Sequence, residues 1–129
     1  MAIQTIDAQT QFLSQLTLDN LGMNTTRFFI ELKSDILELK SEKGSEFIIN
    51  IDEVYEQIKI LHDLKDMFDA GIDTSKQLID LNEFNQNLQV FSQLLEKHRD
   101  KLPRKKENLD NLIVKIKLLR VLLQELVAI

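Results

Sequence analysis

The chain has 129 residues, of which 43% are hydrophobic and 29% charged, and its net charge at pH 7 is −5. This balance is typical of one globular domain over residues 1–129 and excludes an intrinsically disordered chain. The absence of cysteine excludes disulfides and thiolate metal sites. With three glycines and one proline, the chain has few of the turn residues that a β-sandwich needs. We therefore predict an all-α fold, an antiparallel bundle of four main amphipathic helices.

Residues 1–23 are weakly patterned, and we expect a short N-terminal helix or arm there. The first main helix is predicted over about residues 25–43, with Asn24 as its N-cap and Gly44 as its stop. Its apolar residues recur at steps of three and four, as a helix facing a core requires: Phe29, Leu32, Ile36 and Leu39. Three further apolar residues widen this stripe: Phe28, Ile30 and Leu37.

Residues 46–51 are ambiguous, since they are β-branched and aromatic enough for a strand but have no second strand to pair with. We interpret them as a linker on the core or a helical join. A helix is predicted from about Asp52 to the glycine at Gly71. Thr74 and Gln77 fit a capping box, which predicts that the next helix starts there and runs to Leu102.

The last helix is expected after Pro103, and its seam repeats in steps of three and four, like a coiled coil: Leu109, Leu112, Ile116, Leu119, Leu123 and Leu126. More apolar residues flank that seam: Ile113, Val114, Leu118, Val121 and Leu122. Two interpretations stay open. In the first, the helix lies at the centre of the bundle. In the second, one of its faces meets another protein or a second copy of the chain through five candidate anchors, Leu112, Ile116, Leu119, Leu123 and Leu126.

A second candidate site is a basic patch in the turn at residues 97–106, made of Lys97, Arg99, Lys101, Arg104, Lys105 and Lys106. One interpretation is a solvated turn. The other is a docking patch for an acidic protein or a phosphate-bearing partner. Nucleic acid is the less favoured partner, because the patch is small, lacks aromatic residues for stacking, and belongs to an acidic chain.

Catalytic and metal-binding motifs are not found in the sequence. The two histidines, His62 and His98, are not part of a Glu-x-x-His or His-Glu-x-x-His pattern. Asp63, Asp66 and Asp69 lack the spacing of a calcium loop. We therefore expect neither an enzyme nor a bound metal or cofactor.

The function expected from the sequence is a non-enzymatic protein–protein interaction module, such as a helical-bundle or coiled-coil subunit or an adaptor. One alternative is an export or assembly chaperone that shields an amphipathic client helix. Another is a nucleic-acid-associated accessory protein that uses the turn at 97–106. Neither a secretory signal nor a membrane span is recognisable, so we expect a cytoplasmic protein without a membrane partner.

Overall fold

A computed structural model describes residues 6–16, 24–42, 48–102 and 106–127. The regular structure of these residues is entirely helical, which confirms the predicted all-α fold class. In chain order the elements are α1 (Ile6–Gln15), α2 (Thr25–Ser41), α3 (Ile51–Asp69), α4 (Leu81–Lys97), a 3-10 turn η3 (Arg99–Lys101) and α5 (Lys106–Val127). Within the described residues, no helix is long and apolar enough to cross a membrane.

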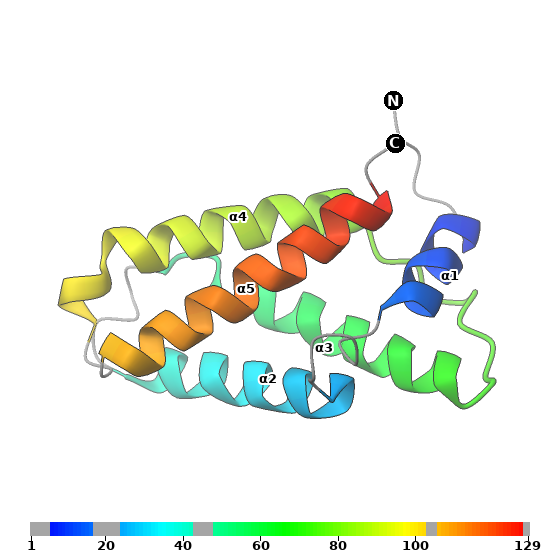
Figure 1. Cartoon of the computed structure of the whole chain (residues 1–129), viewed down its shortest axis with the longest axis horizontal. Helices are drawn as coiled ribbons and strands as arrows, with labels where there is room; N and C mark the ends of the chain where they lie inside the picture. The colour runs from blue at the N-terminus through cyan, green and yellow to red at the C-terminus, as the bar shows by residue number, and fades with distance from the viewer. Residues whose placement is uncertain (1–5, 17–23, 43–47, 103–105, 128–129) are drawn as a thin grey trace.

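The helices pack as neighbouring pairs around one core. α4 lies beside α5, and α2 lies beside α3 below them (Figure 1). Contacts between α3 and α4 join the two pairs, and α2 also meets α5. α1 lies at one end of the molecule, where it packs against α3 and α5 (Figure 1). The surface shared by α2 and α5 is therefore built from segments that are far apart in the sequence.

The core draws apolar side chains from all five helices, because burying apolar surface is the main force that favours folding. Its largest fully buried residues include the aromatic side chains of Phe12, Phe29, Phe84 and Phe91. In α2 the predicted stripe is buried, as is Phe28, whereas Ile30 and Leu37 are exposed. The helical periodicity of the sequence thus identifies the core face of α2 but overestimates its width.

Two polar side chains fix α1 against the rest of the chain. Gln9, which is buried, donates from Nε2 to the Gln77 carbonyl (2.8 Å), and its Oε1 accepts from the Ile79 amide (2.8 Å). Lys65 of α3 donates from Nζ to the Leu13 carbonyl in the last turn of α1 (2.9 Å). A cation there is favourable, because the last carbonyls of a helix lack partners within the helix.

The predicted start of the fourth helix is wrong. Thr74 and Gln77 lie in the irregular segment before α4, and Asp80 is the N-cap, accepting from the Glu83 amide at 3.0 Å. Gln9 binds the backbone of this segment, and such hydrogen bonds compete with those of a helical turn. Leu78, which lies in the same segment, is exposed.

Other boundaries agree more closely with the sequence. Asn24 caps α2 by accepting from the Arg27 amide at 2.9 Å. α2 ends at Ser41, before the predicted stop at Gly44, which lies outside the described residues. Gly71 follows α3 with a φ of 75°, a left-handed conformation that glycine adopts without steric cost.

The remaining differences lie at the connections between helices. Of the ambiguous stretch at 46–51, Ile48 to Asn50 form a turn that leads into α3, while residues 46 and 47 lie outside the described residues. α4 ends at Lys97 rather than Leu102, and η3 follows it. Pro103 also lies outside the described residues.

Candidate functional site

The predicted anchors of α5 lie in the core of the same chain. Leu112, Ile116, Leu119 and Leu123 are all buried, and the side chain of Leu126 lies outside the described residues. Since these four side chains pack on the chain's own helices, a partner would have to displace a helix to reach them. These four residues therefore belong to the hydrophobic core of the chain.

The outward face of α5 nevertheless carries apolar side chains. Val114 is 63% exposed and Val121 is 46% exposed. Because seven residues make nearly two helical turns, both lie on the same face of α5. Leu118 and Leu122 beside them are only partly buried at the edge of the core. α5 therefore has a buried seam and, next to it, a second apolar stripe that meets solvent.

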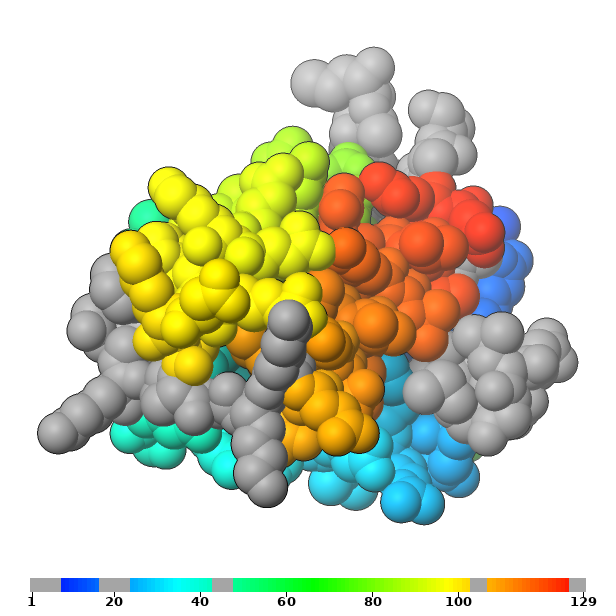
Figure 2. Space-filling view, turned by 60° about the vertical axis from the view of Figure 1, so that its left-hand side comes forward, coloured from blue at the N-terminus to red at the C-terminus, as the bar shows by residue number. Residues whose placement is uncertain are grey.

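α2 carries a similar exposed pair. Ile30 is 54% exposed and Leu37 is 46% exposed, again seven residues apart. Ser34, which is short and exposed, lies between them on this face, and the exposed Glu38 follows Leu37. Figure 2 shows α2, in cyan and blue, lying against α5, in orange, so the two exposed pairs belong to neighbouring helices.

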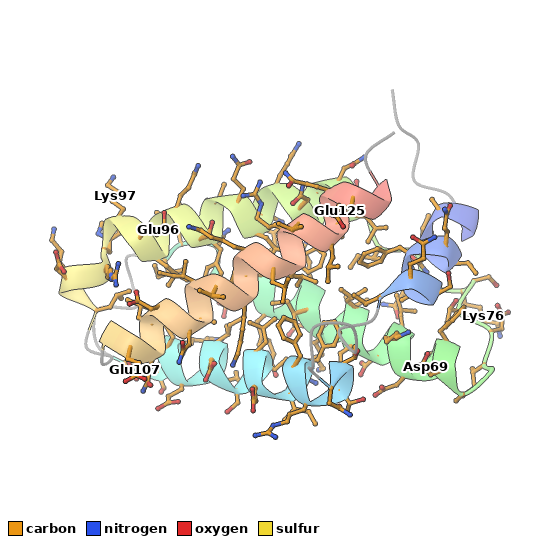
Figure 3. The ribbon with its side chains drawn as sticks, viewed as in Figure 1. Asp69, Lys76, Glu96, Lys97, Glu107 and Glu125 are labelled. Carbon is orange, nitrogen blue, oxygen red and sulfur yellow. The ribbon has the colours of Figure 1, made fainter. Side chains whose placement is uncertain are left out.

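A groove of about 500 Å³ lies between these two helices. It is lined by five residues of α2 and three of α5, namely Ile30, Glu31, Ser34, Asp35, Glu38, Asn108, Asn111 and Lys115. We call this groove, together with the exposed residues Leu37, Val114 and Val121, the α2–α5 surface. Glu107 and Glu125 lie near the two ends of α5, beyond the exposed valines (Figure 3).

Ion pairs cross the groove. Lys115 Nζ lies 3.3 Å from both Glu31 Oε2 and Asp35 Oδ2, and its side chain is largely buried. Arg27 Nε also donates to Glu31 Oε1 at 2.9 Å. The hydrogen bonds from Arg27 and Lys115 lower the pKa of the Glu31 carboxyl below its ordinary value. Glu31 is therefore ionised at neutral pH, and the α2 side of the groove is negatively charged.

The basic patch is described only in part. Lys97 and Lys101 are exposed, and Lys97 points away from the helices at the far end of α4 (Figure 3). Arg99 forms an ion pair with Asp110 of α5. Arg104 and Lys105, and the side chain of Lys106, lie outside the described residues. At least one of the predicted cations thus holds η3 against α5.

His62 is a buried packing residue of α3. Its ring stacks on Phe29 of α2, with centroids 5.2 Å apart and an interplanar angle of 12°. Nε2 lies 3.5 Å from Asp66 Oδ2, too far for a good hydrogen bond. Among the described residues, no three His, Asp or Glu side chains are grouped so as to hold a metal ion.

Burial lowers the pKa of the His62 imidazole below its ordinary value, and the positive charge of Lys33 lowers it further. Asp66 and Asp63 oppose this shift but do not cancel it. The unfolded chain therefore takes up the proton more readily than the folded chain. The stability due to neutral His62 is complete above about pH 6.5 and is lost as the pH falls towards its folded pKa.

We expect the free energy of unfolding to fall from pH 7 to pH 5, and we expect His62→Phe or His62→Leu to reduce this fall. The reduction should be about 1.4 kcal/mol for each unit by which the pKa of His62 differs between the unfolded and the folded chain. Urea unfolding at several pH values, followed by circular dichroism, measures the effect. An identical pH dependence in wild type and both variants would contradict this account of His62.

No family model matches the chain, and neither a curated protein nor a solved structure matches it. Function therefore has to be inferred from the α2–α5 surface itself. The sequence contained a signal for its acidic side, since Glu31, Asp35 and Glu38 follow one another at helical spacing. It contained no signal that α2 would lie next to α5.

Proposed function

We propose that the chain is a non-enzymatic protein–protein interaction module that binds a partner helix on the α2–α5 surface. In this proposal α2 to α5 form an antiparallel four-helix bundle, and α1 covers one end. The observation that supports it is a pair of exposed aliphatic residues on each of the two neighbouring helices. They are Ile30 and Leu37 on α2, and Val114 and Val121 on α5.

A helix that lies along a groove makes its main contacts through apolar side chains at positions such as i, i+3, i+4 and i+7. The seven-residue spacing of each exposed pair matches that repeat. Burying one Val or Leu side chain completely is worth about 1.5–3 kcal/mol. Covering the exposed part of a side chain at each of four positions therefore contributes to the docking of a helix, and this contribution opposes the loss of freedom on binding.

The same groove favours a second candidate, the export or assembly chaperone that shields an amphipathic client helix. A chaperone of this kind needs a groove that is already present in the free protein, and the groove between α2 and α5 meets that condition. Thermal stabilisation of the protein distinguishes a true client from other peptides. A ligand that binds only the folded state raises the melting temperature of the protein as the ligand concentration increases. Melts that no candidate client shifts would count against the chaperone.

Site-specific photo-crosslinking tests the interaction module. Benzoylphenylalanine replaces Val114 on the α2–α5 surface or, as the control, the exposed Lys59 on α3. In extracts of cells that naturally produce the protein, we expect one defined partner to crosslink at position 114 but not at position 59. Adding Ile30→Lys should abolish that crosslink, since a charge replaces an apolar contact.

Equal crosslinking at the two positions, or none at position 114, would contradict the proposal. Mass spectrometry of the crosslinked product identifies the partner, and a second copy of the chain would appear as a product of twice the monomer mass. Light scattering at several concentrations then tests self-association independently. Circular dichroism melts check that both substituted proteins remain folded, as expected for exposed positions.

A further inference from the structure

The segment that leads into α4 contains a turn that is capped like the start of a helix. Asp73 Oδ1 accepts from the Ser75 amide (2.9 Å), as an N-cap side chain does in the first turn of a helix. The Gln77 amide lies 3.4 Å from the Thr74 carbonyl oxygen, which closes a single turn. Residues 77–80 nevertheless have no regular structure, and α4 begins only after them. A capped turn is therefore present, but no helix follows it directly.

Gln9 of α1 occupies the backbone groups that would continue this turn as a helix. In an α-helix each amide donates to the carbonyl four residues earlier, so the Ile79 amide would pair with the Ser75 carbonyl. The Gln77 carbonyl would likewise pair with the Leu81 amide. In the structure the Ile79 amide donates to Gln9 Oε1 (2.8 Å), and the Gln77 carbonyl accepts from Gln9 Nε2 (2.8 Å). The Gln9 side chain and a helical continuation therefore compete for the same donor and the same acceptor.

Leu78 has the register of a core residue but lies at the surface. It precedes Leu81 by three residues, and Leu81, Phe84 and Leu88 belong to the buried face of α4. In a continued helix Leu78 would lie on that face. In the structure it is 48% exposed. α4 begins at the end of the bundle where α1 lies, so a longer α4 would extend towards α1 (Figure 1).

α1 docks through one of its faces. Phe12 and Leu13, and Leu16 just after the helix, are buried, whereas Gln11 and Ser14 on the opposite face are exposed. The main neighbours of α1 are α3 and α5 rather than α2, the next helix in the chain. Substitutions on the buried face of α1 should therefore weaken its docking, and substitutions on the exposed face should leave it intact.

We propose that residues 74–80 are a conformational switch with two alternative states. In the first state, seen in the structure, α1 is docked and Gln9 holds the segment in an irregular conformation. In the second state α1 is undocked, and α4 begins at the capping box of Thr74 and Gln77, which lengthens the helix by nearly two turns, or about 9 Å. Leu78 then packs on the apolar surface that α1 leaves. Docking of α1 and the length of α4 are coupled, because both states use the same backbone groups.

NMR spectroscopy of the full chain tests this coupling. The release variant, Gln9→Ala with Phe12→Ala, removes the hydrogen bonds and one apolar contact of α1. Its matched control, Gln11→Ala with Ser14→Ala, places two alanines on the exposed face of the same helix. In the release variant we expect the Cα chemical shifts of residues 75–80 to become helical. In the wild type and in the control, the state with the longer α4 should stay below about 10%.

Leu78→Gly distinguishes the switch from a general loss of structure. Because Leu78 is exposed when α1 is docked, this change alone should leave the protein folded. Added to the release variant, it removes the leucine that would become buried and introduces a poor helix former. The ratio of the helical to the irregular state of residues 75–80 should then fall at least about tenfold.

The other outcomes would overturn the switch. An α1 that is undocked in the release variant, while residues 75–80 keep the shifts of the wild type, would show that docking and helix length are independent. An α1 that stays docked without the Gln9 and Phe12 contacts, or a control that changes residues 75–80 equally, would show that these contacts do not hold the segment.

Gln9→Ala alone keeps the test valid if circular dichroism shows that the release variant does not fold. It leaves Phe12 in place and removes only the competing hydrogen bonds. We expect a partial change of residues 75–80 towards helical shifts, reversed by Leu78→Gly. Shifts identical to those of the wild type would contradict competition by Gln9.

Discussion

Leu119→Ala should lower the free energy of unfolding by about 2–5 kcal/mol, because it removes a fully buried side chain and leaves a cavity in the core. Val121→Ala, two residues further along α5, should change that free energy by no more than about 0.5 kcal/mol. Val121 is still half exposed in the free protein, so its removal leaves no cavity. Urea unfolding followed by circular dichroism measures both values.

The comparison separates the two apolar stripes of α5. If Val121→Ala were as damaging as Leu119→Ala, the exposed stripe would belong to the core, and the α2–α5 surface would lose one of its contacts. If both changes were harmless, α5 would not be packed as a central helix. Binding of the partner that crosslinks at position 114 should show the opposite pattern, because Val121→Ala removes one contact of the α2–α5 surface.

Phe29→Ala should cost about 3–5 kcal/mol of stability. The Phe29 ring is fully buried, meets Phe28 edge to face at 5.6 Å and stacks on His62 at 5.2 Å. Its loss would therefore create a cavity and weaken the junction between α2 and α3. Thermal and urea unfolding provide the measurement.

Ile30→Ala is the matched control for Phe29→Ala, since Ile30 is the next residue of α2 but faces outward. We expect it to change stability by no more than about 0.5 kcal/mol. Phe29→Ala should also bring His62 closer to water, so the pKa of its imidazole should rise towards the ordinary value. A cost below about 1 kcal/mol for Phe29→Ala would place its ring outside the core.

Local sequence signals predicted much of the fold. The N-cap at Asn24 and the glycine at Gly71 depend on hydrogen bonds and backbone angles within a few residues, and both predictions are confirmed. The core faces of α2 and α5 followed from helical periodicity. These features could be predicted because each is set mainly by its own segment.

Contacts between distant segments account for what the sequence missed. Thr74 and Gln77 carry a capping box, but Gln9 of α1 binds the backbone of that segment, and α4 starts later, after Asp80. Periodicity also could not decide which of the neighbouring stripes of α5 would be covered, because that depends on where α4 and α2 pack. The groove between α2 and α5 depends on the same packing.

Methyl NMR spectra of the full chain, recorded during titration with the partner that crosslinks at position 114, test helix docking between α2 and α5 most directly. The methyl signals of Ile30, Leu37, Val114 and Val121 should shift together. Ile49, Ile72 and Val90 are also exposed aliphatic residues but lie outside the α2–α5 surface, so their signals should remain in place. The largest shifts at these three residues, with none at Val114 and Ile30, would contradict helix docking between α2 and α5.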